Sequence, residues 1–256
     1  MSRFRFCCFN SIGAALFLAI LSSSANSQDV VVPNAFTSAE GPLGNGIPFS
    51  RGDLFCNNGI RYQQVYAGSD LPGSGIINAV RFRLDGDYTA PFPATTYGGV
   101  TIELSRSENS PASLSTTFAD NVGADVVEVF SGDLTLAAPG GGDAPKPFDV
   151  EIPLQTTFSY GGGDLLLDLV IEVCNDLTVF FDSDNSSIIT RRVVAYDRTD
   201  PDGTDASGPG LVTQFGFNAP AARPVPVFGS YGFAGPLLLV SLMLSIGIVF
   251  LRYSAR

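Results

Sequence analysis

Apolar and polar residues alternate along short runs in the central part of the chain. Val80, Phe82 and Leu84 fall on one side of such a run, and Arg81 and Arg83 fall on the other. A period of two is typical of a β-strand with one buried face. The pattern therefore predicts a half-buried strand whose two arginines lie on the polar face.

A second alternating run begins at residue 148. Val150, Ile152 and Leu154 alternate there with Glu151 and Pro153. Proline cannot donate to a β-ladder, so Pro153 indicates an edge strand or the end of a ladder.

Similar runs, rich in β-branched and aromatic residues, recur through residues 28–223 and are separated by Gly, Pro, Asn and Asp clusters. No window longer than about ten residues in this body has a convincing helical period. Many short strands with frequent turns predict an all-β fold, an antiparallel β-sandwich of jelly-roll-like type that forms one domain over residues 28–223. The expected strands are residues 60–66, 76–84, 100–104, 126–130, 134–136, 148–154, 165–173, 177–181, 193–196 and 211–217.

Residues 1–27 have the pattern of a secretory signal peptide. Arg3 and Arg5 precede an apolar run from Ile12 to Leu21, and small residues follow it. This order predicts export and cleavage before Gln28. The run is shorter than the roughly 20 residues of a membrane-spanning helix, which disfavours a simple N-terminal anchor.

Residues 224–256 carry a second membrane signal. The chain has no charged residue from Pro224 to Leu251, and the apolar run that starts at Phe233 would form a helix about 28 Å long, close to the thickness of the hydrocarbon core. Arg252 and Arg256 follow and should stay on the cytoplasmic side. We therefore expect a C-terminal transmembrane helix with a short basic tail and the body outside the inner membrane.

The composition excludes several kinds of chemistry. The 256 residues include no histidine, which excludes Ser-His-Asp systems and imidazole-bound zinc. The net charge is −11, and because the two ends hold four of the 14 basic residues and no acid, the body alone carries 10 basic and 25 acidic residues, or −15. Such a body disfavours nucleic acid as a partner and offers oxygen ligands to hard cations.

One acidic segment has the composition of a cation-binding loop. Asp200, Asp202 and Asp205 flank Gly203, as carboxylates do on a calcium-binding turn, although the full spacing of an EF-hand is absent. The alternative is an ordinary solvent-exposed loop between strands. No other cofactor is predicted. A glycosidase with paired carboxylates also stays open, since that chemistry needs two Asp or Glu and no histidine.

The body contains two cysteines, Cys56 and Cys174. Export would place them in an oxidising compartment, where a disulfide between them is the natural expectation.

The arrangement of the whole chain resembles the exosortase-sorted, PEP-CTERM class of Gram-negative bacteria. Segments of the body that carry the resemblance are Arg61–Tyr66, Leu114–Asp125 and Gly163–Asp168. In place of the Pro-Glu-Pro of that class, this chain has a variant motif that starts with Val-Pro. The sorting motif would consist of Val225, Pro226, Val227, Phe228 and Gly229, with Arg252 and Arg256 at its basic end.

The resemblance implies a non-enzymatic protein of the cell surface or extracellular matrix, associated with exopolysaccharide and biofilm. Its partners would be the membrane, through the C-terminal helix, and an exosortase-type sorting enzyme. Two alternatives remain: a calcium- or carbohydrate-binding β-sandwich module, and a glycan-active hydrolase that uses paired carboxylates.

Overall fold

A computed structural model describes residues 27–50 and 58–218 of the chain. These residues form antiparallel β-sheets joined by loops and short 3-10 turns, so the prediction of an all-β, β-sandwich-like fold is confirmed. Among them, no helix is long and apolar enough to cross a membrane. The expected signal peptide and C-terminal transmembrane helix lie outside the described residues.

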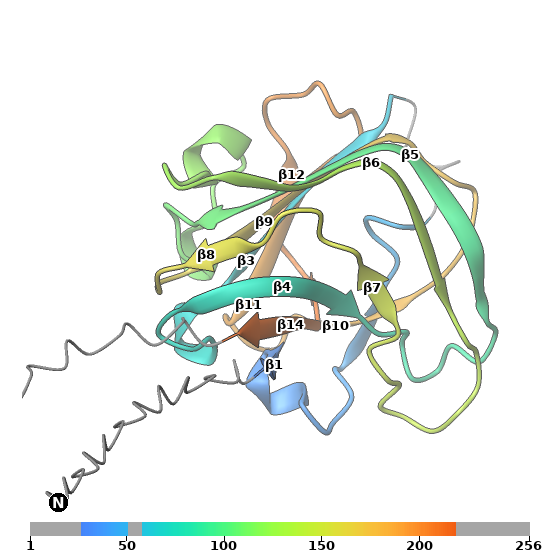
Figure 1. Cartoon of the computed structure of the whole chain (residues 1–256). Helices are drawn as coiled ribbons and strands as arrows, with labels where there is room; N and C mark the ends of the chain where they lie inside the picture. Colours follow the sequence, from blue (N-terminus) through green and yellow to red (C-terminus); the bar gives the residue numbers. More distant parts are fainter. Residues whose placement is uncertain (1–26, 51–57, 219–256) are drawn as a thin grey trace, which may run out of the picture. The chain divides into compact units, whose positions relative to one another are not determined.

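Two sheets make up the main layers (Figure 1). The larger sheet has the order β12-β11-β3-β9-β5-β6, and the second has the order β1-β14-β4-β7, with β8 also paired to β4. The larger sheet consists of β12 (Thr204–Gly208), β11 (Thr190–Ala195), β3 (Ile60–Tyr66), β9 (Leu165–Val173), β5 (Phe92–Arg106) and β6 (Val127–Ala138). The second consists of β1 (Ser27–Val32), β14 (Thr213–Asn218), β4 (Gly75–Phe82), β7 (Val150–Ile152) and β8 (Phe158–Tyr160).

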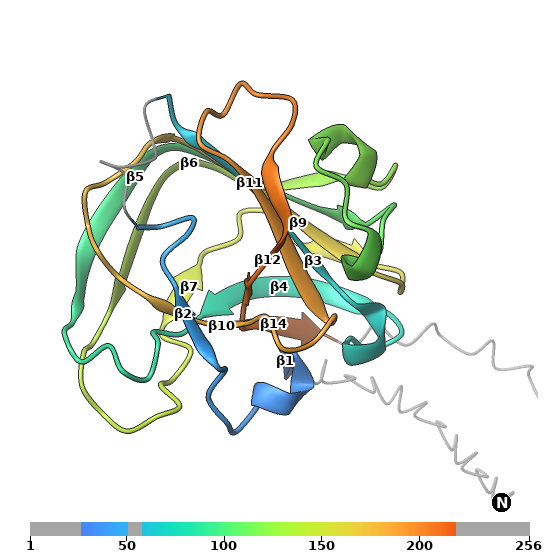
Figure 2. The same ribbon diagram turned by 180° about the vertical axis from the view of Figure 1, so that it is seen from behind.

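A third, smaller sheet lies beside these layers (Figure 2). Its order is β13-β10-β2, with β13 at Gly210–Leu211, β10 at Phe181–Asp184 and β2 at Leu43–Asn45. Short 3-10 turns occur at η1 (Asn34–Phe36), η2 (Gly68–Asp70), η3 (Pro111–Ser113) and η4 (Phe118–Asn121).

The main core lies between the two large sheets and takes its side chains from the inward positions of the alternating strands. Val80, Phe82 and Leu84 are all buried there, as the alternation predicts. Edge-to-face aromatic contacts join Phe49 to Tyr97 and to Phe181, with ring centroids 5.6 and 5.7 Å apart. Offset and edge-to-face packing of this kind adds to the stabilisation from buried area.

The β5–β6 pair is long and curved (Figure 1). Its register shifts in three places, between Phe92 and Thr95, Tyr97 and Val100, and Ile102 and Glu103. Such bulges bend a strand pair and increase its twist, which lets one continuous pair curve around the core. Residues 127–130 and 134–136, which were expected in two strands, belong to the single strand β6.

The prediction for Arg83 is wrong. Arg81 lies on the polar face and pairs with Glu151, but the side chain of Arg83 is only 1% exposed. Its guanidinium forms an ion pair with Asp182 of β10, with Nη2 2.5 Å from Oδ2. Leu84 pairs with Phe181 just beyond the end of β4, so the chain has left the regular ladder of the sheet at Arg83.

The strand expected at residues 177–181 is displaced. The strand in this region is β10 at Phe181–Asp184, and all four of its side chains are buried, including two aspartates. Polar partners explain the difference, because Asp182 binds Arg83 and Gly41, and the Ser183 hydroxyl donates to Leu43 O. At residue 153, by contrast, the ladder ends as Pro153 predicts, since β7 stops at Ile152 and lies at the end of its sheet.

Candidate functional site

A covering segment, residues 107–125, crosses the outer face of the six-stranded sheet and contains η3 and η4 (Figure 2, green). Beneath it lies a second, smaller hydrophobic core, separate from the main one. Its buried residues are Val65, Leu114, Phe118, Leu166, Val193 and Ala195. The outer face of β3, β9 and β11 is therefore apolar here because this segment shields it from water.

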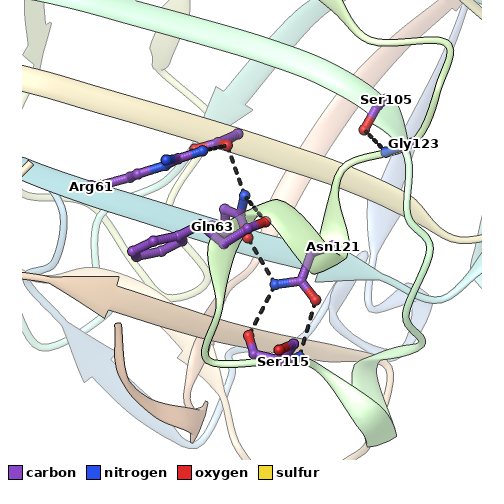
Figure 3. Close-up of polar contacts among 8 residues, drawn as sticks. Arg61, Gln63, Ser105, Ser115, Asn121 and Gly123 are labelled. Atoms are coloured by element: carbon purple, nitrogen blue, oxygen red, sulfur yellow. Dashed lines mark hydrogen bonds and ion pairs between the residues drawn. The ribbon is translucent and has the colours of Figure 1, made fainter. Parts of the chain in front are cut away.

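A polar network fixes the covering segment to the sheet (Figure 3). Arg61 on β3 donates two hydrogen bonds to Asp168 on β9, from Nε to Oδ1 at 3.2 Å and from Nη2 to Oδ2 at 2.7 Å. Gln63 donates from Nε2 to the same Oδ2 at 2.7 Å and to Phe118 O at 3.1 Å. Asp168 is 4% exposed, so its charge is stabilised by partners rather than by water.

Asn121 connects this network to the covering segment. Its Nδ2 donates to Gln63 Oε1 and to Ser115 O, both at 2.9 Å. Its Oδ1 accepts from the Ser115 N–H at 3.0 Å. Asn121 therefore fixes both backbone groups of Ser115, and with them the positions of Leu114 and Thr116. A separate bond from the Gly123 N–H to Ser105 Oγ, 3.2 Å long, holds the far end of the segment (Figure 3).

Two further charges lie in register with Asp168 on the same face. Glu103 on β5 is the direct partner of Asp168 and, on its other side, of Glu128 on β6. Burial raises the pKa of Glu103, and the charges of Asp168 and Glu128 raise it further, while Arg61 opposes them. Arg61 also lies over the Phe118 ring, with Cζ 4.7 Å from the centroid. Arg61 thus contacts both the acidic side chains of the sheet and the covering segment.

A cleft of about 470 Å³ opens between the covering segment and strands β11 and β12. Its apolar lining consists of Pro111, Ala112, Leu114, Ile188 and Ala206. Its polar lining consists of Thr116, Arg191, Asp205 and Ser207. We call it the η3–β12 cleft.

An irregular pairing shapes the β12 wall of the cleft. Arg192 pairs with Gly208 and Val194 with Thr204, so β12 uses four residue steps where β11 uses two. Asp205 to Ser207 therefore bulge out of the ladder, and Asp205 has a left-handed backbone with φ of 56°. The bulged residues are the ones that line the cleft.

The loop before β12 ties the two walls together. Asp202 accepts a 2.6 Å hydrogen bond from the Thr117 hydroxyl, and the Gly203 N–H donates to Thr116 O at 2.8 Å. A Cβ at Gly203 would lie 2.5 Å from Val193 Cγ2 and 3.0 Å from Phe118 Cζ. Only glycine lets this loop approach the second core so closely.

Two of the three residues predicted to bind calcium form side-chain hydrogen bonds within the protein. Asp200 and Asp202 are exposed in the loop between β11 and β12, as expected, but Asp205 belongs to β12. Asp202 binds Thr117, and Asp205 accepts from the N–H and hydroxyl of Ser207 at 3.2 and 2.7 Å. In the described part of the chain, no three acidic, Cys or His side chains are grouped as a metal site requires. Calcium binding at these residues stays a prediction.

A second cavity, of about 350 Å³, lies beside β2 and is lined by Glu40, Asp85 and Asp87 among others. Below it, Asp182 is fully buried, and both of its oxygens accept hydrogen bonds, Oδ1 from the Gly41 N–H and Oδ2 from Arg83. The pKa of Asp182 is raised to about 6, because burial and, to a smaller extent, the charge of Glu40 outweigh the opposing effects of Arg83 and the Gly41 N–H. The carboxyl is enclosed and bonded, so it is poorly placed to exchange protons with a substrate.

Only one of the other predicted site residues lies among the described residues. Cys174 packs against the main core, while Cys56 lies outside the described residues, so their disulfide stays a prediction. The sorting-motif residues 225–229, Arg252 and Arg256 also lie outside the described residues.

The residues of the polar network and the residue of β11 that lines the cleft were not identified from the sequence. One signal was present: a lone aspartate, Asp168, interrupts the apolar run of β9, and a buried acid requires a partner. The partner itself could not be read from the sequence, because Arg61 is 107 residues away.

Comparisons with known proteins add no identification. No family model, curated protein or solved structure matches the chain.

Proposed function

We propose that the chain is an exported, non-enzymatic protein of the cell surface or extracellular matrix of a Gram-negative bacterium. In this proposal, an exosortase-type enzyme recognises the motif around Pro226 and processes the chain after export. The β-sandwich, of jelly-roll-like type, is the part that remains outside the cell.

The observation that carries the proposal is the closure of the body at its two ends. Ser27 at the start of β1 is the direct ladder partner of Asn218 at the end of β14. The first strand begins at the residue before the expected cleavage point, and the last ends before the expected sorting motif. Cleavage before Gln28 would remove only Ser27 from the described sheets, and cleavage near Pro226 would remove none of their residues, as a processed surface protein requires.

The hydrogen-bond partners of the two buried aspartates support a non-enzymatic role. A glycosidase needs one carboxyl group that can donate a proton and another that can attack or activate water. Asp168 and Asp182 are buried, and each is bound by an arginine and by an N–H group. Their partners keep these two acids in structural roles, so neither is a candidate carboxyl group for the hydrolase alternative.

The test is to express the full chain in a Gram-negative host that carries an exosortase. Mass spectrometry would then define both ends of the surface-exposed form. We expect an N-terminus at Gln28 and a C-terminus between Pro226 and Gly229. Pro226→Ala should leave Arg256 attached and the protein in the membrane fraction, while Pro220→Ala, upstream of the motif, should be processed normally.

Two results would contradict the proposal in different ways. Intact Arg256 in the surface form of the unaltered chain would mean that the C-terminal segment is only an anchor. Full-length protein that keeps Met1 and stays in the cytoplasm would mean that the chain is not exported.

A further inference from the structure

We propose that the η3–β12 cleft binds a short stretch of an uncharged polysaccharide. The inference rests on the proposed function, because it names the matrix component to which the exported body would attach. It is carried by the chemistry of the cleft lining.

The cleft has one apolar and one polar group of side chains. Leu114 and Ala206 belong to or pack against the second core and give the cleft a firm apolar floor. Ile188, also in the lining, is 63% exposed and adds an accessible apolar side chain at the rim of the cleft. A sugar ring has an apolar face of C–H groups and a rim of hydroxyls, so it matches both groups of side chains.

The hydrogen-bonding groups of the lining suit hydroxyl groups. Within residues 27–50 and 58–218, the guanidinium of Arg191 donates only through Nη1, to Ser187 O and Thr190 O. Asp205 likewise accepts only at Oδ1, from Ser207. The remaining guanidinium N–H groups can donate and Asp205 Oδ2 can accept, and a pair of sugar hydroxyls both donates and accepts.

The charge of the lining favours a neutral ligand. Arg191 and Asp205 contribute one positive and one negative charge, so the lining as a whole is uncharged. An acidic polymer would gain from Arg191 alone and would be repelled by a body of net charge −15. A cationic ligand would find only one carboxylate in the lining.

The cleft is built before any ligand arrives. Its volume of about 470 Å³ falls within the range of roughly 300–1,000 Å³ that is usual for small-molecule sites. Asn121 and Asp202 hold the covering segment and the loop before β12 in place, so little ordering is required on binding. No aromatic residue lines the cleft, so each site should bind weakly, with a Kd of about 1 mM, and attachment would depend on many copies along one polymer.

The experiment uses the full chain, purified in detergent and immobilised for surface plasmon resonance. The probes are cellohexaose and maltohexaose as neutral oligosaccharides, a galacturonate hexamer as an acidic one, and calcium chloride alone. We expect at least one neutral hexamer to bind with millimolar Kd, without calcium, and the galacturonate hexamer to bind at least tenfold more weakly.

Variants test whether binding uses this cleft. Arg191→Gln and Asp205→Asn should each weaken binding of the neutral hexamer at least fivefold, and asparagine tolerates the left-handed backbone at position 205. Arg81→Gln, on the exposed face of the other sheet, is the control and should bind normally. If the thermal melt shows that Arg191→Gln does not fold, binding of the neutral hexamer to Asp205→Asn alone tests whether the cleft is used.

Three results would overturn the inference: no binding of either neutral hexamer at 10 mM, binding that survives both cleft variants, or preferential binding of the galacturonate hexamer. Because the binding assay uses purified protein, none of these three results changes the outcome of the processing experiment in cells. Cytoplasmic retention of the chain in cells would instead remove the proposed function, whatever the cleft binds.

Discussion

Individual arginines form ion pairs with acidic residues of this body, both buried and exposed. Asp168 and Asp182 are buried against Arg61 and Arg83, whereas Glu151 is 51% exposed and pairs with Arg81 at 2.6 Å. The bond lengths are similar, but the surroundings differ. When a buried pair loses one partner, the other charge is left in a medium of low polarity, while water replaces the partner of an exposed charge.

We therefore predict unequal costs for removing the two kinds of carboxylate. Asp168→Ala should lower the free energy of unfolding by about 3 kcal/mol, because Arg61 and Gln63 both lose an acceptor. Glu151→Ala should lower it by less than about 1 kcal/mol. Urea denaturation of the two variants and the parent chain measures both values. Equal costs would show that Asp168 is solvated in solution.

Asp182 predicts a dependence of stability on pH. Burial raises the pKa of its carboxyl in the folded protein to about 6, from 3.8. Between these two values the folded state holds a proton that the unfolded state has released, so acidification favours folding. The contribution of Asp182 to stability is complete below pH 3.8 and is lost as the pH rises through 6.

The measurement compares the unaltered chain with Asp182→Asn at pH 7, 6, 5 and 4. The free energy of unfolding of the unaltered chain should increase relative to that of the variant as the pH falls over this range. Parallel pH profiles would mean that Arg83 keeps the carboxyl ionised throughout, which contradicts the raised pKa.

At the scale of elements, the covering segment depends on one aromatic side chain. Phe118 is fully buried, contributes its ring to the second core and lies under the Arg61 guanidinium. Its carbonyl also accepts from Gln63. The apolar and polar attachments of the segment therefore meet at η4.

We predict that Phe118→Ala loosens the segment before the sheets unfold. The cavity left in the second core should cost about 3 kcal/mol, whereas Phe118→Leu, which keeps most of the volume, should cost less than about 1.5 kcal/mol. Hydrogen exchange followed by mass spectrometry should show faster exchange over residues 107–125 in the alanine variant and unchanged exchange in β9. Uniformly faster exchange would instead mean that the segment and the sheet unfold together.

The sequence predicts those elements whose burial follows from their own residues. β3 and β9 begin and end where their apolar runs predict, at Ile60–Tyr66 and Leu165–Val173. β10 is displaced because its polar residues are buried by distant partners: Asp182 depends on Arg83, 99 residues earlier. A window of local sequence contains no information about such a partner.

The candidate site divides in the same way. The acidic loop before β12 was predictable as an exposed turn, because Asp, Pro and Gly are concentrated there. The cleft beside it was not, since it requires the covering segment to lie against β11 and β12. That contact depends on Asn121, Thr117 and Gly203, which are separated along the chain and meet only in the folded body.

At the scale of the whole molecule, the pairing of β1 with β14 in the second sheet determines which residues the body needs in order to fold. These two strands pair over six positions, from Ser27 with Asn218 to Val32 with Thr213, so the two ends of the described body are bonded to each other. Val30, Val32, Phe215 and Phe217 place this pair in the main core. The body should thus fold without the segments that flank it in the sequence.

A circular permutant tests this closure directly. Asn218 would be joined to Gln28 by about six Gly and Ser residues, a linker with ample reach for neighbouring strand ends. The new ends would be opened between Gly141 and Gly142, which are exposed and where an added Cβ would meet nothing within 4 Å. We expect the permutant and the linear chain of residues 28–218 to show the same circular dichroism spectrum, with melting temperatures within about 4 °C of each other, roughly the effect of 1 kcal/mol in a chain of this length. If the linear chain folds and the permutant does not, the two ends are not neighbours in solution. If neither folds, the flanking segments are needed for folding.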